Sequence, residues 1–554
     1  MAPTAAAAVA APASRQSPEE DLLHKPRPYT PSPWGEFFLT HQPCTPEELV
    51  AMKEKAQVKE EEVRKILLDA SASSDLVRKL DLVDALQRLG VDYHYKKEID
   101  ELLRAVYDDK DGGSDDLYAT SLRFYLLRKH GYTVPSDVFA KFRDEHGNIS
   151  SDDVNCLLTL YDAAHTRTHG EEILDSIITF NKSRLQSLLK TDLEPELAEE
   201  VRFTLETTRF RRVERVEARR FIPVYEKKAA RDETILEFAK LDYNILQVLY
   251  CEELKELTIW WKGFMSRTDL RFARDRMVEI HFWMMGVVYE PYYSYSRIML
   301  TKLIIFISLF DDLYDNYSTT EESQIFTTAM ERWDEKAAEQ FPAYLKALYN
   351  NILGTTDEIV EELKLQNNEH AETVRQLVID MAKCYHAEVK WRDERYVPTD
   401  VEEHLQISVR SSACMHIISL AFISLGNVTT REAIEWASTY PNIIRGVCIV
   451  GRIGNDMVSH EREQSSEHVA STVQTCMKQY GVTEEEANEK LRVVIEKAWM
   501  DIVQECLDQK HPMAILEKAA DLGRTMDFMY KREDAYTLSF SLKEILTSMY
   551  VKFV

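Results

Sequence analysis

The chain has 554 residues, more than a single hydrophobic core usually holds, so two domains are expected. Its 94 acidic and 68 basic residues give a net charge of −26, which argues against nucleic acid and anionic membranes as partners. The 16 glycines and 17 prolines are fewer than an average composition gives, which favours long helices over a many-stranded sheet.

The eight cysteines stand singly along the chain, and no two form a CxxC pair. This pattern argues against zinc-binding and disulfide frameworks and favours a reducing compartment. No apolar run approaches the ~20 residues of a membrane-spanning helix, so we expect no membrane insertion. Residues 1–26 are alanine-rich, with no basic residue before the alanines, which predicts a disordered, untargeted tail and a cytoplasmic protein.

A proline-punctuated segment follows at residues 25–39 and holds Arg27, Tyr29 and Trp34. These residue types are unusual for a simple linker. We expect the segment either to extend across another domain or to pack on its own domain.

A helix is predicted to begin at Thr45, which is followed by Pro46 at the first helical position and by Glu48 as the partner in a capping box. Residues 27–238 are assigned to an N-terminal helical domain, and residues 239–554 to a second, more aromatic domain. Further helices are predicted in the first domain over residues 76–89, 99–106, 117–129 and 157–169.

The apolar run 304–310 leads directly into Asp311, Asp312 and Asp315. Asp311 and Asp315 are four residues apart, so on a helix they share one face, where two like charges are destabilising. A cation between them would remove this repulsion, and carboxylate oxygens suit Mg²⁺. The alternative is a solvated helix end.

A second acidic stretch places Asn455, Ser459 and Glu463 at intervals of four residues, which is one face of a helix. An amide, a hydroxyl and a carboxylate oxygen can complete a Mg²⁺ shell together with water and a phosphate. The alternative is an ordinary polar helix face.

Three arginines accompany the acidic stretches: Arg274 and Arg276 upstream of the first, and Arg452 one turn before Asn455. Guanidinium groups bind phosphate oxygens in a bidentate way, although ion pairs with nearby acids are the commoner role. Aromatic residues gather around Trp283; such clusters usually belong to the core, but an indole face also stabilises a cation.

The arginine stretch at 274–276, the Asp-Asp-Leu-Tyr-Asp motif at 311–315 and the series from Asn455 to Glu463 resemble those of plant class I terpene synthases. The resemblance extends from Arg27 to the C-terminus. It implies an all-α fold with an N-terminal α-barrel-like domain and a C-terminal class I terpenoid synthase bundle that holds the active-site cavity. Because the DxDD motif of protonation-initiated cyclases is absent, we expect no site in the first domain.

The resemblance also assigns roles to individual residues. Two Mg²⁺ ions would be bound by Asp311, Asp312 and Asp315, and a third by Asn455, Ser459 and Glu463, with Mn²⁺ able to substitute. The diphosphate would be held by Arg274, Arg276 and Arg452 together with Asp311, Asp315 and Asn455. Around the cavity, Trp283 and Tyr536 would line the wall, and Asp534 would belong to the lid loop within residues 529–537.

The short tail and the single Arg27 before Trp34 are similar to those of cytosolic sesquiterpene synthases. These enzymes ionise farnesyl diphosphate and convert the resulting carbocation into a hydrocarbon or alcohol. We therefore expect a monomeric enzyme whose partner is a small prenyl diphosphate. The alternatives are a monoterpene synthase that uses geranyl diphosphate and a non-catalytic helical scaffold. Arg410 is an unusual charge where the family has a kinked cavity helix, which leaves the cavity shape open.

Overall fold

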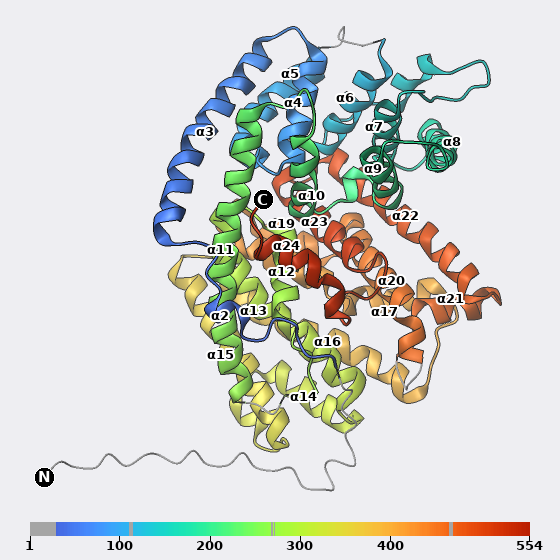
Figure 1. Cartoon of the computed structure of the whole chain (residues 1–554). Helices are drawn as coiled ribbons and strands as arrows, with labels where there is room; N and C mark the ends of the chain where they lie inside the picture. Colours follow the sequence, from blue (N-terminus) through green and yellow to red (C-terminus); the bar gives the residue numbers. More distant parts are fainter. Residues whose placement is uncertain (1–28, 110–114, 268–269, 271, 465–468) are drawn as a thin grey trace, which may run out of the picture.

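The computed structural model describes residues 29–109, 115–267, 270, 272–464 and 469–554. In these residues the secondary structure is helical and contains no strand, which confirms the all-α prediction. The helices form two packed bodies, one above the other in Figure 1. The predicted tail at residues 1–26, and Arg27 with it, lies outside the described residues.

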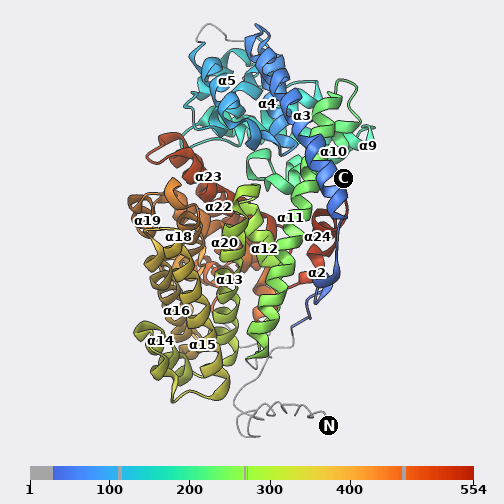
Figure 2. The ribbon, with the colours of Figure 1, turned by 90° about the vertical axis from the view of Figure 1, so that its left-hand side faces the viewer.

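The N-terminal helices form the upper body in Figures 1 and 2. The predicted capping box is confirmed, because the Thr45 side chain accepts from the backbone of Glu48 and the Glu48 side chain accepts from the backbone of Thr45. The α-helices of this body are α3 (Pro46–Ala72), α4 (Leu76–Arg88), α5 (Lys96–Asp108), α6 (Leu117–Lys129), α7 (Val154–Ala164), α8 (Glu172–Leu188), α9 (Pro195–Glu206) and α10 (Glu214–Glu226).

The helix predicted over residues 157–169 is wrong at both ends. It begins earlier because the Asp153 side chain accepts from the backbone of Cys156 and so caps the helix, and it ends at Ala164. Gly170, at φ +82°, then turns the chain toward α8. Periodicity alone did not locate this cap.

α11 (Glu233–Ser266) is a single helix of 34 residues that runs from the upper body into the lower one (Figure 2). The predicted domain boundary between residues 238 and 239 falls inside this helix, near its N-terminal end, and it remains a prediction.

The lower body is a bundle of antiparallel and crossed helices. At its centre lies α12, in which all eleven residues are buried. Its α-helices after α11 are α12 (Met277–Val287), α13 (Ser294–Asp311), α14 (Thr320–Arg332), α15 (Ala343–Leu365), α16 (Ala371–Glu394), α17 (Val401–Ser411), α18 (Cys414–Ser424), α19 (Arg431–Ser438), α20 (Asn442–Gln464), α21 (Thr472–Tyr480), α22 (Glu484–Asp508), α23 (Met513–Met529) and α24 (Lys543–Tyr550).

The segment before α3 lies on the lower body, which confirms that it extends across another domain. The backbone oxygen of Thr30 accepts from Arg276 at 3.2 Å. In the short helix α2 (Phe37–Thr40), Phe38 packs edge-on against Tyr550 at 6.2 Å between ring centroids. The N-terminal segment is therefore part of the structure around the C-terminal bundle.

One apolar stretch corrects the expectation drawn from composition. Val401–Ser424 is long and apolar enough to cross a membrane, yet 78% of its apolar window is buried inside the protein. It is also interrupted, because Ala413 takes a left-handed backbone conformation between α17 and α18. Its apolarity is accounted for by packing within the bundle.

Candidate active site

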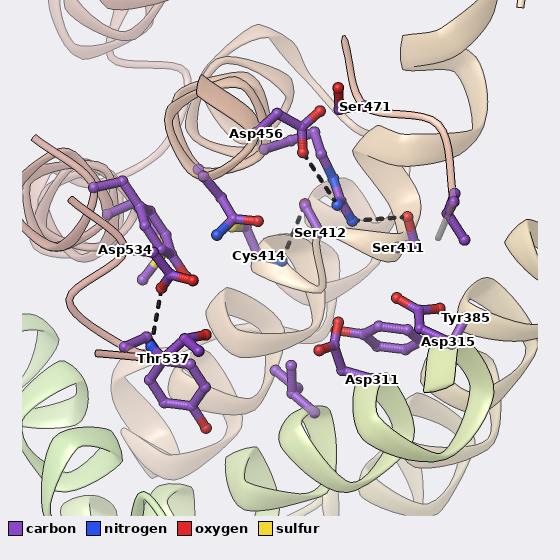
Figure 3. Close-up of a pocket in the computed structure, with 18 of the residues that line it drawn as sticks. Asp311, Asp315, Tyr385, Ser411, Ser412, Cys414, Asp456, Ser471, Asp534 and Thr537 are labelled. Carbon is purple, nitrogen blue, oxygen red and sulfur yellow. Dashed lines mark hydrogen bonds and ion pairs between the residues drawn. The ribbon is translucent and has the colours of Figure 1, made fainter. Parts of the chain in front are cut away.

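A cavity opens in the lower body between helices that are far apart in the sequence (Figure 3). Oxygen-bearing side chains from two of these helices face each other across it. The apolar and aromatic part of its wall includes Trp283 of α12, Ile307 of α13, Ile417 of α18 and Met526 of α23.

The first acidic motif has a local geometry that the sequence did not predict. α13 ends at Asp311, and residues 312–317 form a wider π-helical turn in place of another α-helical turn. Such turns occur frequently at functional sites. Asp311 and Asp315 both line the cavity, whereas Asp312 is fully buried outside its lining.

Asp312 faces Arg274. The backbone N–H and the Nε of Arg274 donate to Oδ2 of Asp312 at 2.8 and 3.2 Å, and a second guanidinium nitrogen of Arg274 pairs with Asp311. Asp312 therefore positions the arginine, and of the three aspartates it is the one that the structure keeps away from the cavity.

The surroundings of Asp315 disfavour the charged form of its carboxyl group. It is buried, and its Oδ1 has no hydrogen-bond partner among the described residues. Burial, followed by the negative charges of Asp311 and Glu388, raises the pKa of Asp315 well above its usual value. The charged form of this carboxyl is therefore disfavoured unless a cation lies close by.

The opposite wall is α20, whose Asn455 and Glu463 line the cavity. Ser459, between them on the same helix, is fully buried, and its Oγ has no hydrogen-bond partner in the described part of the chain. The neighbouring Asp456 has a structural contact, because its Oδ2 accepts from the backbone of Thr472 at 2.6 Å.

This set of donors fits a hard divalent cation. All the candidates are oxygen ligands, which Mg²⁺ prefers, and unpaired buried oxygens of Asp315 and Ser459 are present on the two facing walls. Asp311 and Asp315 could hold metal on one side, and Asn455 and Glu463 on the other. The individual ligand assignments remain predictions.

Arg452 lies in the cavity wall one turn before Asn455. Its Nε donates to the backbone oxygen of Ser408 at 3.3 Å and its Nη2 to the Ser411 hydroxyl at 3.2 Å, while Nη1 lies 3.7 Å from Asp456. Arg274 also lines the cavity. Both guanidinium groups can approach an anion bound between the two acidic walls.

Arg276, the third predicted phosphate ligand, lies outside the cavity lining. It is fully buried and donates to the backbone oxygens of Tyr536 and Thr537 at 2.8 and 2.9 Å, in addition to Thr30. The side chain thus fastens the loop after α23 and the N-terminal segment to the bundle.

That loop covers one side of the cavity, and Tyr530, Asp534, Tyr536 and Thr537 all line it. The ring of Tyr536 lies 4.7 Å from that of Trp283. Asp534 accepts from the backbone of Thr537 at 3.0 Å, as Figure 3 shows, and pairs with Arg462 near the end of α20.

Sequence reasoning missed two lining residues of α16, Tyr385 and Glu388. Glu388 is buried, accepts from the Ser411 hydroxyl, and has its pKa raised by burial. A signal was available: Glu388 occupies a position on the apolar stripe formed by Met381 and Tyr385, where a carboxylate is unexpected.

Arg410, the unusual charge expected near the cavity, does not line the cavity, because the helix is broken between α17 and α18. Arg410 is exposed, and its guanidinium lies 5.6 Å from the ring centroid of Tyr440, away from the cavity. The cavity receives Ser411, Ser412 and Cys414 from the break between α17 and α18 instead (Figure 3).

Comparison with known proteins gives consistent matches along the chain. The model described as "Terpene synthase, N-terminal domain" matches residues 33–205, and "Terpene synthase family, metal binding domain" matches residues 262–501. The chain is 56% identical over 543 residues to (E)-beta-caryophyllene synthase from Zea mays, with 98% of each chain covered. It is 44% identical over 524 residues to (E)-beta-farnesene synthase from Zea diploperennis, covering 94% of this chain and 98% of that one.

A solved structure matches as well. It is isoprene synthase from grey poplar leaves (Populus x canescens) in complex with three Mg²⁺ ions and dimethylallyl-S-thiolodiphosphate. The TM-score is 0.84 at 30% sequence identity, and the match covers 94% of this chain and 99% of that one.

Proposed function

The chain belongs to the terpene synthase family, and on this premise we propose that it is a sesquiterpene synthase. Its substrate is farnesyl diphosphate, which loses diphosphate to give an allylic carbocation. The cation then cyclises or rearranges to a sesquiterpene hydrocarbon or alcohol. One observation supports this function best: two oxygen-bearing walls face each other at a cavity whose other walls include apolar and aromatic side chains.

The choice of a C15 substrate is supported by the relatives. The two with 56% and 44% identity are named for caryophyllene and farnesene, which are sesquiterpenes. Both matches cover nearly the whole chain.

Different side chains of the cavity lining serve different parts of the chemistry. Arg274 and Arg452 offer guanidinium groups to the leaving diphosphate, which they orient and whose charge they balance. The faces of Trp283 and Tyr536 stabilise the migrating positive charge, and the Tyr536 ring also lies 5.3 Å from the guanidinium of Arg274. The apolar Ile417 and the loop over the cavity exclude water that would otherwise quench the cation.

The metal-binding domain implies dependence on a divalent metal, and we propose three Mg²⁺ ions, for which Mn²⁺ can substitute. Bound metal supplies Lewis acidity that neutralises the departing diphosphate. The oxygen-only donor set supports Mg²⁺, and the related isoprene synthase structure contains three Mg²⁺ ions.

We also propose that the protein is a cytoplasmic monomer. All eight cysteines lie in the described residues and are free, which suits a reducing compartment. Size-exclusion chromatography with light scattering, and imaging of a C-terminally tagged chain in plant cells, test the two statements separately.

The activity is tested by incubating the purified chain with Mg²⁺ and either farnesyl or geranyl diphosphate as the only substrate. Gas chromatography should detect C15 products, and a separate phosphate assay should detect the released diphosphate. Products from geranyl diphosphate alone would assign the chain as a monoterpene synthase. No diphosphate release from either substrate would favour the non-catalytic scaffold.

A further inference from the structure

A second cluster of potential metal ligands lies between α16 and α18. Asp380 and Cys384 are one turn apart on α16 and face His416 of α18. The His416 Nε2 is 2.9 Å from Asp380 Oδ2, and the Cys384 Sγ is 3.7 Å from the same oxygen. One ligand atom from each residue lies within 4.8 Å of the other two.

This cluster is distinct from the catalytic cavity. None of its three residues lines the cavity, and the same two helices supply other residues to it: Tyr385 and Glu388 from α16, and Cys414 and Ile417 from α18. The two helices therefore present one set of side chains to the cavity and another to this cluster.

The donor set differs in kind from that of the cavity. It combines an imidazole nitrogen, a sulfur and a carboxylate oxygen, which is a combination that Zn²⁺ accepts and Mg²⁺ does not prefer. Zinc bonds of about 2.0–2.3 Å to three such atoms require ligand separations on the order of 3–4 Å, close to those present. We propose that Asp380, Cys384 and His416 form a second metal site, which takes a thiolate-binding divalent cation such as Zn²⁺.

Burial and access both agree with such a site. His416 is fully buried, and its Nε2 faces the Asp380 carboxylate. Cys384 is also buried, whereas the Asp380 side chain is 37% exposed and gives the ion a route from solvent. The hydroxyl of the nearby Tyr440 is a further buried polar atom for which no partner is found in the described part of the chain.

The side chain of Arg410 competes with a metal ion for Cys384 and Asp380. Its charge acts on Cys384 and Asp380, and a hydrogen bond links it to the Cys384 thiol. Burial raises the pKa of Cys384 to about 12, so the thiol keeps its proton until a metal ion replaces it. Binding therefore releases this proton to solvent, moves Arg410 away, and becomes tighter as the pH rises.

The proposal is tested by adding Co²⁺ to the full chain after treatment with a chelator. A cobalt–thiolate bond gives a charge-transfer absorption in the near ultraviolet that cobalt at an oxygen-only site does not give. We expect this absorption at one equivalent of cobalt per chain, its loss in Cys384→Ser, and its retention in Cys414→Ser, the matched change at the cavity cysteine. No such absorption, or an absorption lost in Cys414→Ser and kept in Cys384→Ser, would overturn the site.

Three further variants show whether a loss of metal binding is caused by the loss of a ligand or by unfolding. His416→Gln and Asp380→Asn should each weaken Zn²⁺ retention in equilibrium dialysis by about tenfold or more, with unchanged helix content. Arg410→Gln, which removes the competing charge, should tighten it by about fivefold. Retention that is equal in the wild type and in all three variants would mean that zinc binds elsewhere.

Discussion

Two sites in the C-terminal bundle contain buried acids, but their surroundings differ. One site is Glu253 with its hydrogen-bond partners, and the other is the group of acids in the cavity. Glu253 of α11 is buried against α12 and α13, where His281 donates to it at 2.8 Å and Arg297 at 2.6 and 2.9 Å. The acids of the cavity include Asp315, on which the negative charges of Asp311 and Glu388 act more strongly than the positive charge of Arg452. Both groups are removed from water, but only in the first do the surrounding hydrogen bonds and charges outweigh the effect of burial on the carboxylate.

The pKa values express this difference. Burial raises the pKa of Glu253, but the hydrogen bonds of His281 and Arg297 outweigh it and bring the value down to about 2. For Asp315, burial and the neighbouring acids act in the same direction and raise the pKa. A buried carboxylate whose pKa the protein lowers is held in its charged form by the fold, whereas one whose pKa it raises is disfavoured in its charged form unless a cation binds beside it.

The largest expected effect concerns the balanced group. Glu253→Gln leaves the fully buried Arg297 without its counter-charge, so the free energy of unfolding should fall by about 3–5 kcal/mol. Urea unfolding of the metal-free protein measures this. Glu256→Gln is the matched control on the same helix, because its exposed pair with Lys302 at 3.6 Å should contribute less than about 1 kcal/mol. A large loss in the control would show that α11 tolerates no substitution there.

In the cavity, by contrast, we expect a substitution to reduce activity and not stability. Asp315→Asn should reduce turnover by about 10²–10³-fold, which corresponds to about 2.7–4 kcal/mol of transition-state stabilisation. The melting temperature of the metal-free protein should stay the same or rise, because a carboxyl group whose charged form is disfavoured at this buried position is replaced by a neutral amide.

Asp312→Asn provides the comparison within the same motif, since Asp312 binds Arg274 and lies outside the cavity lining. It should lower stability while metal binding, measured by calorimetry with Mg²⁺ and diphosphate, is largely kept. Equal loss of metal binding in both variants would mean that Asp312 is a ligand as well.

The contributions of the two groups to the free energy of unfolding should change with pH in opposite directions. The contribution of Glu253 is lost as the pH falls, whereas that of Asp315, whose folded pKa is raised, is lost as the pH rises. Because the folded pKa of Glu253 is about 2, against 4.5 normally, its contribution is present above about pH 4.5 and is lost as the pH falls toward 2. This shift corresponds to about 3 kcal/mol. The difference in unfolding free energy between the wild type and Glu253→Gln should therefore shrink over this range. A difference that is independent of pH would exclude a charged Glu253.

The spacing of polar residues predicted which side chains of each acidic stretch point into the cavity. Residues four apart on a helix share a face, and this holds without knowledge of the helix that packs opposite. Asp311 with Asp315, and Asn455 with Glu463, reach the same cavity. Even the π-helical turn left both aspartates in its lining.

The roles that depend on distant partners were not predictable in this way. Arg276 matches a phosphate-binding motif, but its hydrogen bonds go to backbone oxygens of Thr30, Tyr536 and Thr537, which only the tertiary fold brings near. Similarly, Asp312 faces Arg274 because the chain before α12 returns to the end of α13. Sequence periodicity describes one helix at a time, and these contacts join segments more than thirty residues apart.

The smallest effect is expected for an ion pair in the loop that covers the cavity. Arg462 pairs with Asp534 of the covering loop, and its side chain is 35% exposed, so the pair is neither fully buried nor free in solvent. Such a pair contributes up to about 1 kcal/mol. Arg462→Gln should therefore reduce turnover by at most about fivefold and release more water-quenched alcohol relative to hydrocarbon, since the loop excludes water less well. Arg532→Gln, which breaks the more exposed pair with Glu206, is the control for charge removal on the same side. If Arg462→Gln instead lowered turnover as much as Asp315→Asn, Arg462 would belong with Arg274 and Arg452 among the residues that bind diphosphate.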